Sequence, residues 1–350
     1  MIDCDNGNAF MGSLQRLAEH NCIPLNVTFE LTPHCNFNCV MCYVRLTKEQ
    51  AAEQGRMLTA DEWLEIARQV RDSGTLNLCL TGGEPLAHPD FWEIYSRLNE
   101  MGFLISILSN GSLIDETAIE KFRLYGKPFC IKLTLYGASD ETYSDVCGCT
   151  DGFTRITKAI DLLTAEQIPL KMSATVVKQN AEELQKMYAF ANEKGIPFRH
   201  TISVLRSPRG AVNNAEESRF ALHDFPDEIT LEELEKTLVP PIEFPFVTCG
   251  SYRNSMWVTW HGHVQLCSFL AEPYIQYSGD AAADFKALTS ALKKLKCPSE
   301  CADCRYKMFC QRCPGILCAE SGHPEKIDKS FCLMAEKLFR IYEKKKGDTV

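Results

Sequence analysis

The sequence predicts an α/β protein in which an open, partial (β/α)6 barrel is followed by a cysteine-rich C-terminal domain. Between about residues 24 and 205, short β-branched or apolar segments alternate with segments of helical spacing. That alternation is typical of parallel strands joined by helices. From residue 249 onward the chain is dense in cysteine, and half of its 18 cysteines lie there. These two observations define the fold class and the two main parts of the chain.

Six segments of the first part are predicted to be strands: 25–31, 76–80, 104–109, 129–135, 170–177 and 198–204. Helical spacing separates them, and Thr59 with Glu62 forms a capping box before the first apolar helical pattern. Six strand–helix units are too few to close an eight-stranded barrel, so we expect an open one. Functional groups of such folds gather at the carboxyl ends of the strands.

The chain divides into four predicted regions: an N-terminal extension at 1–23, the barrel at 24–215, a bridging segment at 216–248 and the cysteine-rich domain at 249–350. The bridging segment contains several prolines and one short helical pattern at 231–238. In the last region, residues 256–266 read as a β-hairpin, with the turn at 261–263.

Composition and charge exclude several classes of protein. The net charge of −9 disfavours nucleic acid as the main partner. No apolar run approaches the roughly 20 residues of a membrane span, and the N-terminus lacks the basic start and apolar core of a signal peptide. We therefore expect a cytoplasmic protein with no membrane partner. In a reducing cytosol, clustered cysteines are more often metal ligands than disulfides.

Three of the cysteines, Cys35, Cys39 and Cys42, follow the first predicted strand directly. Three thiolates at this spacing can converge on one [4Fe–4S] cluster and leave its fourth iron open. An open iron can chelate a small molecule through an amine and a carboxylate. Zinc is the alternative metal for these cysteines, although it prefers four protein ligands and paired C-x-x-C motifs.

This C-x3-C-x2-C triplet, together with Gly82-Gly83-Glu84 after the second strand, resembles the signature of the radical S-adenosylmethionine (SAM) superfamily. The resemblance implies a cluster held by the triplet and a SAM molecule bound over the strand ends. Arg206 and Arg209 are both candidates to pair with the SAM carboxylate, and Arg206 is preferred. The implied SAM-contacting residues are Met41, Tyr43, Gly82, Gly83, Glu84, Ser109, Asn110, Lys132, Tyr136, Ser173 and Arg206.

The C-terminal cysteines resemble those of the SPASM domain, which in radical SAM enzymes binds two auxiliary [4Fe–4S] clusters. The resemblance implies that Cys249, Cys267 and Cys313 hold the nearer cluster. It assigns the distal cluster to Cys301, Cys304, Cys310 and Cys332. The fourth ligand of the nearer cluster is left open between Cys297, Cys318 and no protein ligand. Two residues separate Cys310 from Cys313, where the family usually has three. Structural zinc is the alternative for these C-x-x-C pairs.

SPASM-bearing members mostly modify ribosomally made peptides, so the resemblance implies three [4Fe–4S] clusters, SAM and a precursor peptide as substrate. The alternatives within this chemistry are formylglycine formation, as in sulfatase maturases, and small-molecule dehydrogenation. A non-catalytic iron–sulfur electron carrier is a different class. Implied partners are a low-potential donor such as ferredoxin or flavodoxin and a separate leader-recognition protein, because only about 24 residues precede the first strand. Cys147 and Cys149 are candidate hydrogen-atom donors.

Overall fold

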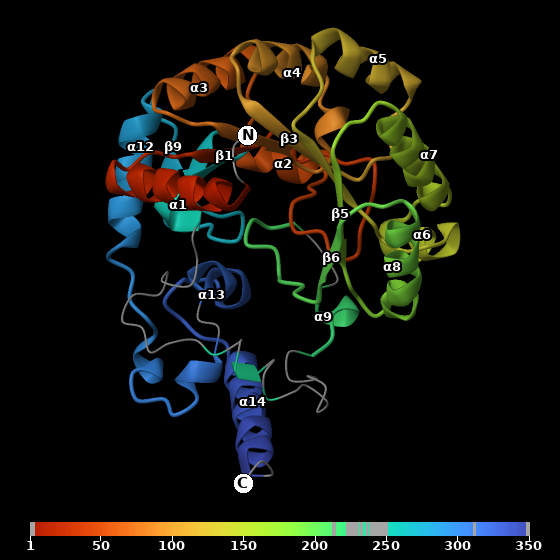
Figure 1. Ribbon diagram of the computed structural model, residues 1–350. Helices are drawn as coiled ribbons and strands as arrows, with labels where there is room; N and C mark the ends of the chain where they lie inside the picture. The colour runs from red at the N-terminus through yellow and green to blue at the C-terminus, as the bar shows by residue number, and fades with distance from the viewer. Residues whose placement is uncertain are drawn as a thin grey trace.

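The computed structural model describes residues 4–211, 215–221, 231, 234–235, 238, 251–310 and 313–347. Within these residues, nine strands form one sheet in the order β6-β5-β4-β3-β2-β1-β7-β8-β9 (Figure 1). The predicted fold class, a partial α/β barrel with a cysteine-rich C-terminal region, is confirmed. Cys249 and most of the helical pattern at 231–238 lie outside the described residues.

Six parallel strands make up the barrel: β1 (Asn26–Glu30), β2 (Asn77–Thr81), β3 (Leu104–Ser109), β4 (Cys130–Thr134), β5 (Leu170–Thr175) and β6 (Phe198–Thr201). Each one overlaps a predicted strand. Side chains alternate between the two faces of a strand. On β4, Ile131 and Leu133 are buried in the core, whereas Lys132 between them is exposed on the inner face. The core therefore lies between the sheet and the helices outside it.

The helices that cover the outer face of the barrel follow the strands in order: α3 (Ala60–Asp72), α4 (Phe91–Glu100), α5 (Glu116–Tyr125), α6 (Asp140–Cys147), α7 (Gly152–Ala165) and α8 (Leu184–Glu193) (Figure 1). The predicted capping box begins α3: Thr59 accepts a hydrogen bond from the backbone of Glu62, whose carboxylate accepts one from the backbone of Thr59. Trp63 and Val70 of this helix are fully buried.

The predicted hairpin is present as β7 (Ser255–Val258) and β8 (His263–Gln265), with β9 (Ile275–Gln276) beside it. Its turn begins earlier than expected, because Gly262 donates a backbone hydrogen bond to Thr259 and His263 already belongs to β8. Strand β7 pairs in parallel with β1, and Val27 lies opposite Met256. The start of the C-terminal region thus extends the barrel sheet itself.

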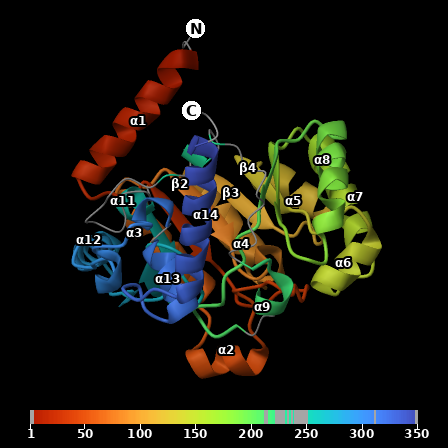
Figure 2. The same ribbon diagram turned by 90° about the horizontal axis from the view of Figure 1, so that it is seen from below.

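The rest of the C-terminal region consists mainly of α12 (Ala281–Leu292), α13 (Pro314–Ser321) and α14 (Lys329–Gly347). A second core forms here from Leu234, Phe309, Cys310, Phe331, Ala335 and Leu338. The remaining helices are α1 (Cys4–His20), α2 (Lys48–Gln54), α9 (Ala215–Ser218) and α11 (Ser251–Asn254). In Figure 2, α1 projects away from the rest of the molecule. No helix among the described residues combines the length and apolarity needed to span a bilayer.

Candidate active site

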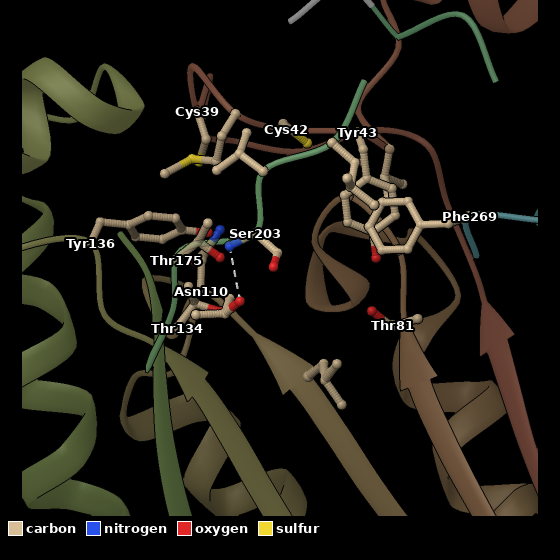
Figure 3. A pocket seen from close by; sticks show the side chains of 18 of the residues that line it. Cys39, Cys42, Tyr43, Thr81, Asn110, Thr134, Tyr136, Thr175, Ser203 and Phe269 are labelled. Carbon is tan, nitrogen blue, oxygen red and sulfur yellow. Dashed lines mark hydrogen bonds between the residues drawn. The ribbon is translucent and has the colours of Figure 1, made fainter. Parts of the chain in front are cut away.

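A cavity of about 500 Å³ lies at the carboxyl ends of the barrel strands. Thr81, Ser109, Thr134, Thr175 and Thr201 line it from strands β2 to β6, and Figure 3 shows the labelled threonines of this set at the strand ends. The loop after β1 covers the cavity with Cys39 and Cys42. Phe269 and Ile316 line it from the C-terminal region. This is the edge at which parallel α/β folds bind ligands.

The cysteine loop is fixed against the end of α6. The backbone N–H groups of Asn38 and Val40 donate to the carbonyls of Cys147 and Val146, each at 2.9 Å. Phe37 is buried beneath the loop and packs edge-on against the ring of Tyr136, with 6.0 Å between ring centroids. These contacts hold the segment that carries all three cysteines at the mouth of the cavity.

The three thiols lie in an environment that disfavours free thiolates. Burial raises the pKa of Cys35 to about 12, and the thiols of Cys39 and Cys42 act in the same direction. Contact with the thiol of Cys147, followed by burial, raises the pKa of Cys39, and burial raises that of Cys42. Three clustered, desolvated thiolates need a compensating cation. An iron cluster supplies that charge, because metal binding and thiol deprotonation are coupled.

Gly82 and Gly83 form a cradle that no other residue fits. A Cβ on Gly83 would lie 2.2 Å from the backbone oxygen of His34, and one on Gly82 would lie 2.5 Å from that of Thr32. Both glycines line the cavity, so the close approach exposes their backbone edge to it. Gly82 also has a φ of +150°, which side chains rarely adopt.

Glu84 is completely buried next to this cradle and ties two strand ends together. Its carboxylate accepts hydrogen bonds from the hydroxyl of Ser109 at 2.9 Å and from the backbone N–H of Asn110 at 2.8 Å. The Asn110 amide in turn donates to Asn36 at 3.0 Å and contacts the sulfur of Cys35 at 3.7 Å. The network connects β2, β3 and the cysteine loop.

Most of the other predicted SAM-contacting residues also lie at the cavity. Met41, Tyr43, Ser109, Asn110 and Tyr136 line it. The Tyr43 ring lies against that of Phe269, with 4.4 Å between centroids, so the loop and the C-terminal region meet here (Figure 3). Burial raises the pKa of Tyr43 to about 12, which keeps its hydroxyl neutral.

Four of the predicted SAM-contacting residues do not line the cavity: Glu84, Lys132, Ser173 and Arg206. Lys132 and Ser173 lie on the inner barrel face, each two residues before a threonine that does line it. The guanidinium of Arg206 contacts the carboxylate of Glu216 and the backbone oxygen of Glu320.

The alternative cation, Arg209, is paired as well. Its Nη1 lies 2.7 Å from both carboxylate oxygens of Glu30. Both guanidiniums that were considered for the SAM carboxylate therefore have partners within the protein.

The two candidate hydrogen-atom donors lie at the end of α6, outside the cavity lining. Cys147 is fully buried and donates from its sulfur to the carbonyl of Tyr143 at 3.0 Å. Cys149 is partly buried, and its sulfur lies 3.3 Å from the carboxylate of Asp151. Burial raises the pKa of Cys149, which makes it a less reactive thiol.

The C-terminal cysteines separate into two neighbourhoods. Cys313 precedes α13 and Cys318 lies within it, and the helix residue Gly315 lies so close to Cys267 that its Cβ would be 3.5 Å from the sulfur. Cys310 belongs to the second core, and Cys304 and Cys332 interact electrostatically. Cys301 is buried beside Cys304, and Cys297 is partly buried. Among the described residues, no three His, Cys, Asp or Glu side chains are arranged to share one metal ion.

Several residues of the cavity were not predicted from the sequence: Thr134, Thr201, Ser203, Phe269 and Ile316. The threonines had a usable signal, since each lies near the carboxyl end of a parallel strand, where such folds bind ligands. Phe269 and Ile316 had none, because they reach the cavity only through the packing of the C-terminal region.

The residues present fit an iron–sulfur cluster with SAM beside it. Cys39 and Cys42 line the cavity and Cys35 lies next to Gly83, the glycine cradle presents bare backbone to the cavity, and Tyr43 and Tyr136 supply flat apolar surface. This donor set combines soft sulfur ligands with backbone polar groups, as such a pair of ligands requires.

Comparison with known proteins agrees with this site. Residues 29–191 match the model of the radical SAM superfamily. An AdoMet-dependent heme synthase from Methanosarcina barkeri is 32% identical over 53% of this chain. The antilisterial bacteriocin subtilosin biosynthesis protein AlbA from Bacillus subtilis is 23% identical over 72% of it. The chain covers little more than half of these two relatives, 52% and 56% of their lengths.

Among solved structures, the chain is similar to Streptococcus suis SuiB bound to precursor peptide SuiA. The match covers 95% of this chain and 82% of the SuiB chain. The TM-score is 0.66 at 18% sequence identity, a likeness that concerns the fold. The superfamily match covers the cysteine triplet, the glycine cradle and strands β2 to β5. Residues 29–191 form a radical SAM domain, and the C-terminal region that follows it is rich in cysteine.

Proposed function

We propose that this protein is a radical SAM enzyme that modifies a ribosomally made peptide. The observation that carries the proposal is that Cys39, Cys42 and the Gly82-Gly83 cradle line one cavity, with Cys35 packed against Gly83. Cys35, Cys39 and Cys42 would hold a [4Fe–4S] cluster next to SAM, and these two groups would supply the radical chemistry that removes a hydrogen atom from the substrate.

The residues of this chain bind and orient the reactants. Gly82 and Gly83 offer backbone groups to the methionine amine, and Glu84 holds that turn in place. Met41, Tyr43 and Tyr136 provide the surface for the adenosyl part, and Phe269 and Ile316 exclude water from the far side. Ser173 and Arg206 are proposed to contact SAM, whereas Lys132, which does not line the cavity, is assigned to the substrate. A closed, dry cavity matters because it keeps the reactive species close to one substrate hydrogen.

We also propose the two auxiliary [4Fe–4S] clusters. The nearer would use Cys267 and Cys313 with Cys249, and the position of Cys318 on α13 favours it over Cys297 as a fourth ligand. The distal would use Cys301, Cys304, Cys310 and Cys332. Replacing Cys301 and Cys304 with serine should remove about four irons per chain. A variant that keeps wild-type iron content would contradict this assignment.

A precursor peptide is the proposed substrate. SuiB is described as bound to its precursor peptide, and AlbA as a bacteriocin biosynthesis protein. A ferredoxin or flavodoxin would supply the electron, a separate protein would recognise the leader, and the reaction would take place in the cytoplasm. The heme synthase match favours a small molecule as the second candidate substrate.

The test is to incubate the reconstituted enzyme, SAM and reductant with small peptides encoded beside its gene. The proposal predicts that one peptide changes mass and that 5′-deoxyadenosine forms in proportion. The Cys42→Ala variant is the control and should leave the peptide unchanged. Consumption of a porphyrin precursor with no peptide modified would support the small-molecule candidate instead.

A further inference from the structure

Three cations lie side by side on the inner face of the barrel, just below the cavity: Lys132 on β4, Lys171 on β5 and Arg199 on β6. Each is exposed, and each belongs to the same face as a cavity-lining threonine. Thr134 lies two residues beyond Lys132, and Thr201 two residues beyond Arg199. At a rise of about 3.3 Å per residue, those cations are roughly 7 Å below the cavity wall, within reach of a long side chain.

The strand register places like charges next to each other. Lys132 is the direct partner of Lys171 on the neighbouring strand, and Arg199 is the partner of Ser173, two residues along β5. Like charges directly opposite each other on one sheet face are destabilising. The arrangement is unusual in a chain with a net charge of −9, and it is unfavourable unless an anion lies between the cations.

No carboxylate of the described residues compensates these charges. None of the three cations takes part in an ion pair or a hydrogen bond there, whereas Arg209 and Arg219 are each paired with a glutamate at 2.7 Å. The Lys132 charge instead acts on the thiol of Cys79, two strands away on β2: it opposes the burial that raises the pKa of that thiol to about 11. The side chain of Lys132 is therefore directed into the barrel.

We propose that Lys132, Lys171 and Arg199 bind a carboxylate of an acidic segment in the peptide substrate. The inference rests on the proposed function, since it assigns to that substrate an acidic residue next to the modified one. Arg199 can take a carboxylate in bidentate fashion, and the two lysines add charge without fixed geometry. Anchoring the acidic residue below the cavity leaves its neighbour inside, facing the strand-end threonines.

The experiment measures binding to the reconstituted, SAM-loaded enzyme by fluorescence anisotropy. The probes are two capped, fluorescein-labelled tetrapeptides, one of glutamate and one of glutamine. The variants are Lys171→Gln, Arg199→Gln and the double variant. Lys48→Gln is the matched control, because Lys48 is an exposed lysine at the start of α2. Equilibrium dialysis measures the binding of SAM in parallel.

The glutamate peptide should bind wild type and Lys48→Gln equally, and more tightly than the glutamine peptide. The double variant should bind it at least about tenfold more weakly, the typical effect of a lost charge-assisted contact, with SAM binding unchanged. Equal binding of both peptides, or of the double variant and wild type, would overturn the proposal. Loss of SAM binding in the double variant would also overturn the proposal. The same holds if inorganic phosphate competes with the labelled peptide as strongly as the unlabelled glutamate peptide does. The proposed function is tested by a different result, since absence of SAM cleavage would contradict it.

Discussion

The carboxylate of Glu84 and the backbone N–H of Asn110 form a buried hydrogen bond of 2.8 Å between the ends of β2 and β3. The same carboxylate accepts from the hydroxyl of Ser109 and from the backbone of Leu86. The glycine cradle is thereby fixed to the strand end beside it. These hydrogen bonds give Glu84 a positioning role at the site.

Replacing Glu84 should destabilise the protein in a graded way. Glu84→Ala leaves three buried donors without an acceptor and should cost about 3 kcal/mol or more in the free energy of unfolding. Glu84→Gln keeps one acceptor oxygen and should cost less. Urea denaturation measures the free energy of unfolding of both variants, and the exposed Glu53→Ala serves as the control. Equal stability of all three variants would contradict the assigned role.

The glycine cradle should not tolerate a single methyl group. In Gly83→Ala the new Cβ meets the His34 carbonyl at 2.2 Å, so the backbone must move and the SAM-facing edge with it. We expect SAM binding to fall by at least about tenfold, as measured by equilibrium dialysis on the reconstituted protein. Gly12→Ala, on α1 with no contact closer than 3.5 Å, is the control and should bind normally. Normal binding by Gly83→Ala would show that the cradle does not contact SAM.

The contribution of His261 to the stability of the protein should fall on mild acidification. Burial lowers the pKa of this imidazole to about 4, and His263 and Arg209 act in the same direction. Between its unfolded pKa of about 6.5 and that value, the unfolded state binds more protons than the folded state. The His261 contribution to the free energy of unfolding therefore decreases as the pH falls through this window, by at most about 1.4 kcal/mol per pH unit.

Urea denaturation at about pH 7 and about pH 5 measures this slope. His261→Asn should show a shallower pH dependence than wild type, whereas the exposed His20→Asn should match wild type. If the free energy of unfolding of His261→Asn changes with pH as steeply as that of wild type, the pH dependence arises from other groups.

Replacing only one partner of the ion pair between Arg209 and Glu30 should lower the free energy of unfolding. Glu30 is 1% exposed and Arg209 11% exposed at the side chain, and the indole N–H of Trp257 also donates to Glu30. Glu30→Gln leaves a buried guanidinium without a counter-charge and should cost about 3–5 kcal/mol. Adding Arg209→Met should restore part of that loss, and thermal denaturation of the two single variants and the double variant forms the cycle. Additive losses would mean that the pair is not coupled.

Much of this fold could be predicted from the sequence because its signals are local. The alternation of buried side chains located β3 at its observed bounds, and the Thr59–Glu62 capping box located the start of α3. The cysteine triplet and the two glycines could be placed at one strand edge because parallel strands end together.

The parts that escaped prediction depend on contacts between distant segments. The pairing of β7 with β1 and the approach of Phe269 to Tyr43 join residues more than 200 positions apart. The inward direction of Lys171 and Arg199 required the strand register, and the pairing of Arg209 with Glu30 required the packed structure. A spacing motif carries none of this information.

The most direct test of the central claim is the formation of 5′-deoxyadenosine from SAM by the anaerobically reconstituted, dithionite-reduced protein. Iron is counted in the same sample. The account predicts about twelve irons per chain and deoxyadenosine in wild type. In the variant with Cys35, Cys39 and Cys42 replaced by alanine, it predicts about eight irons and no deoxyadenosine. Deoxyadenosine formation by that variant at the wild-type rate would contradict the account.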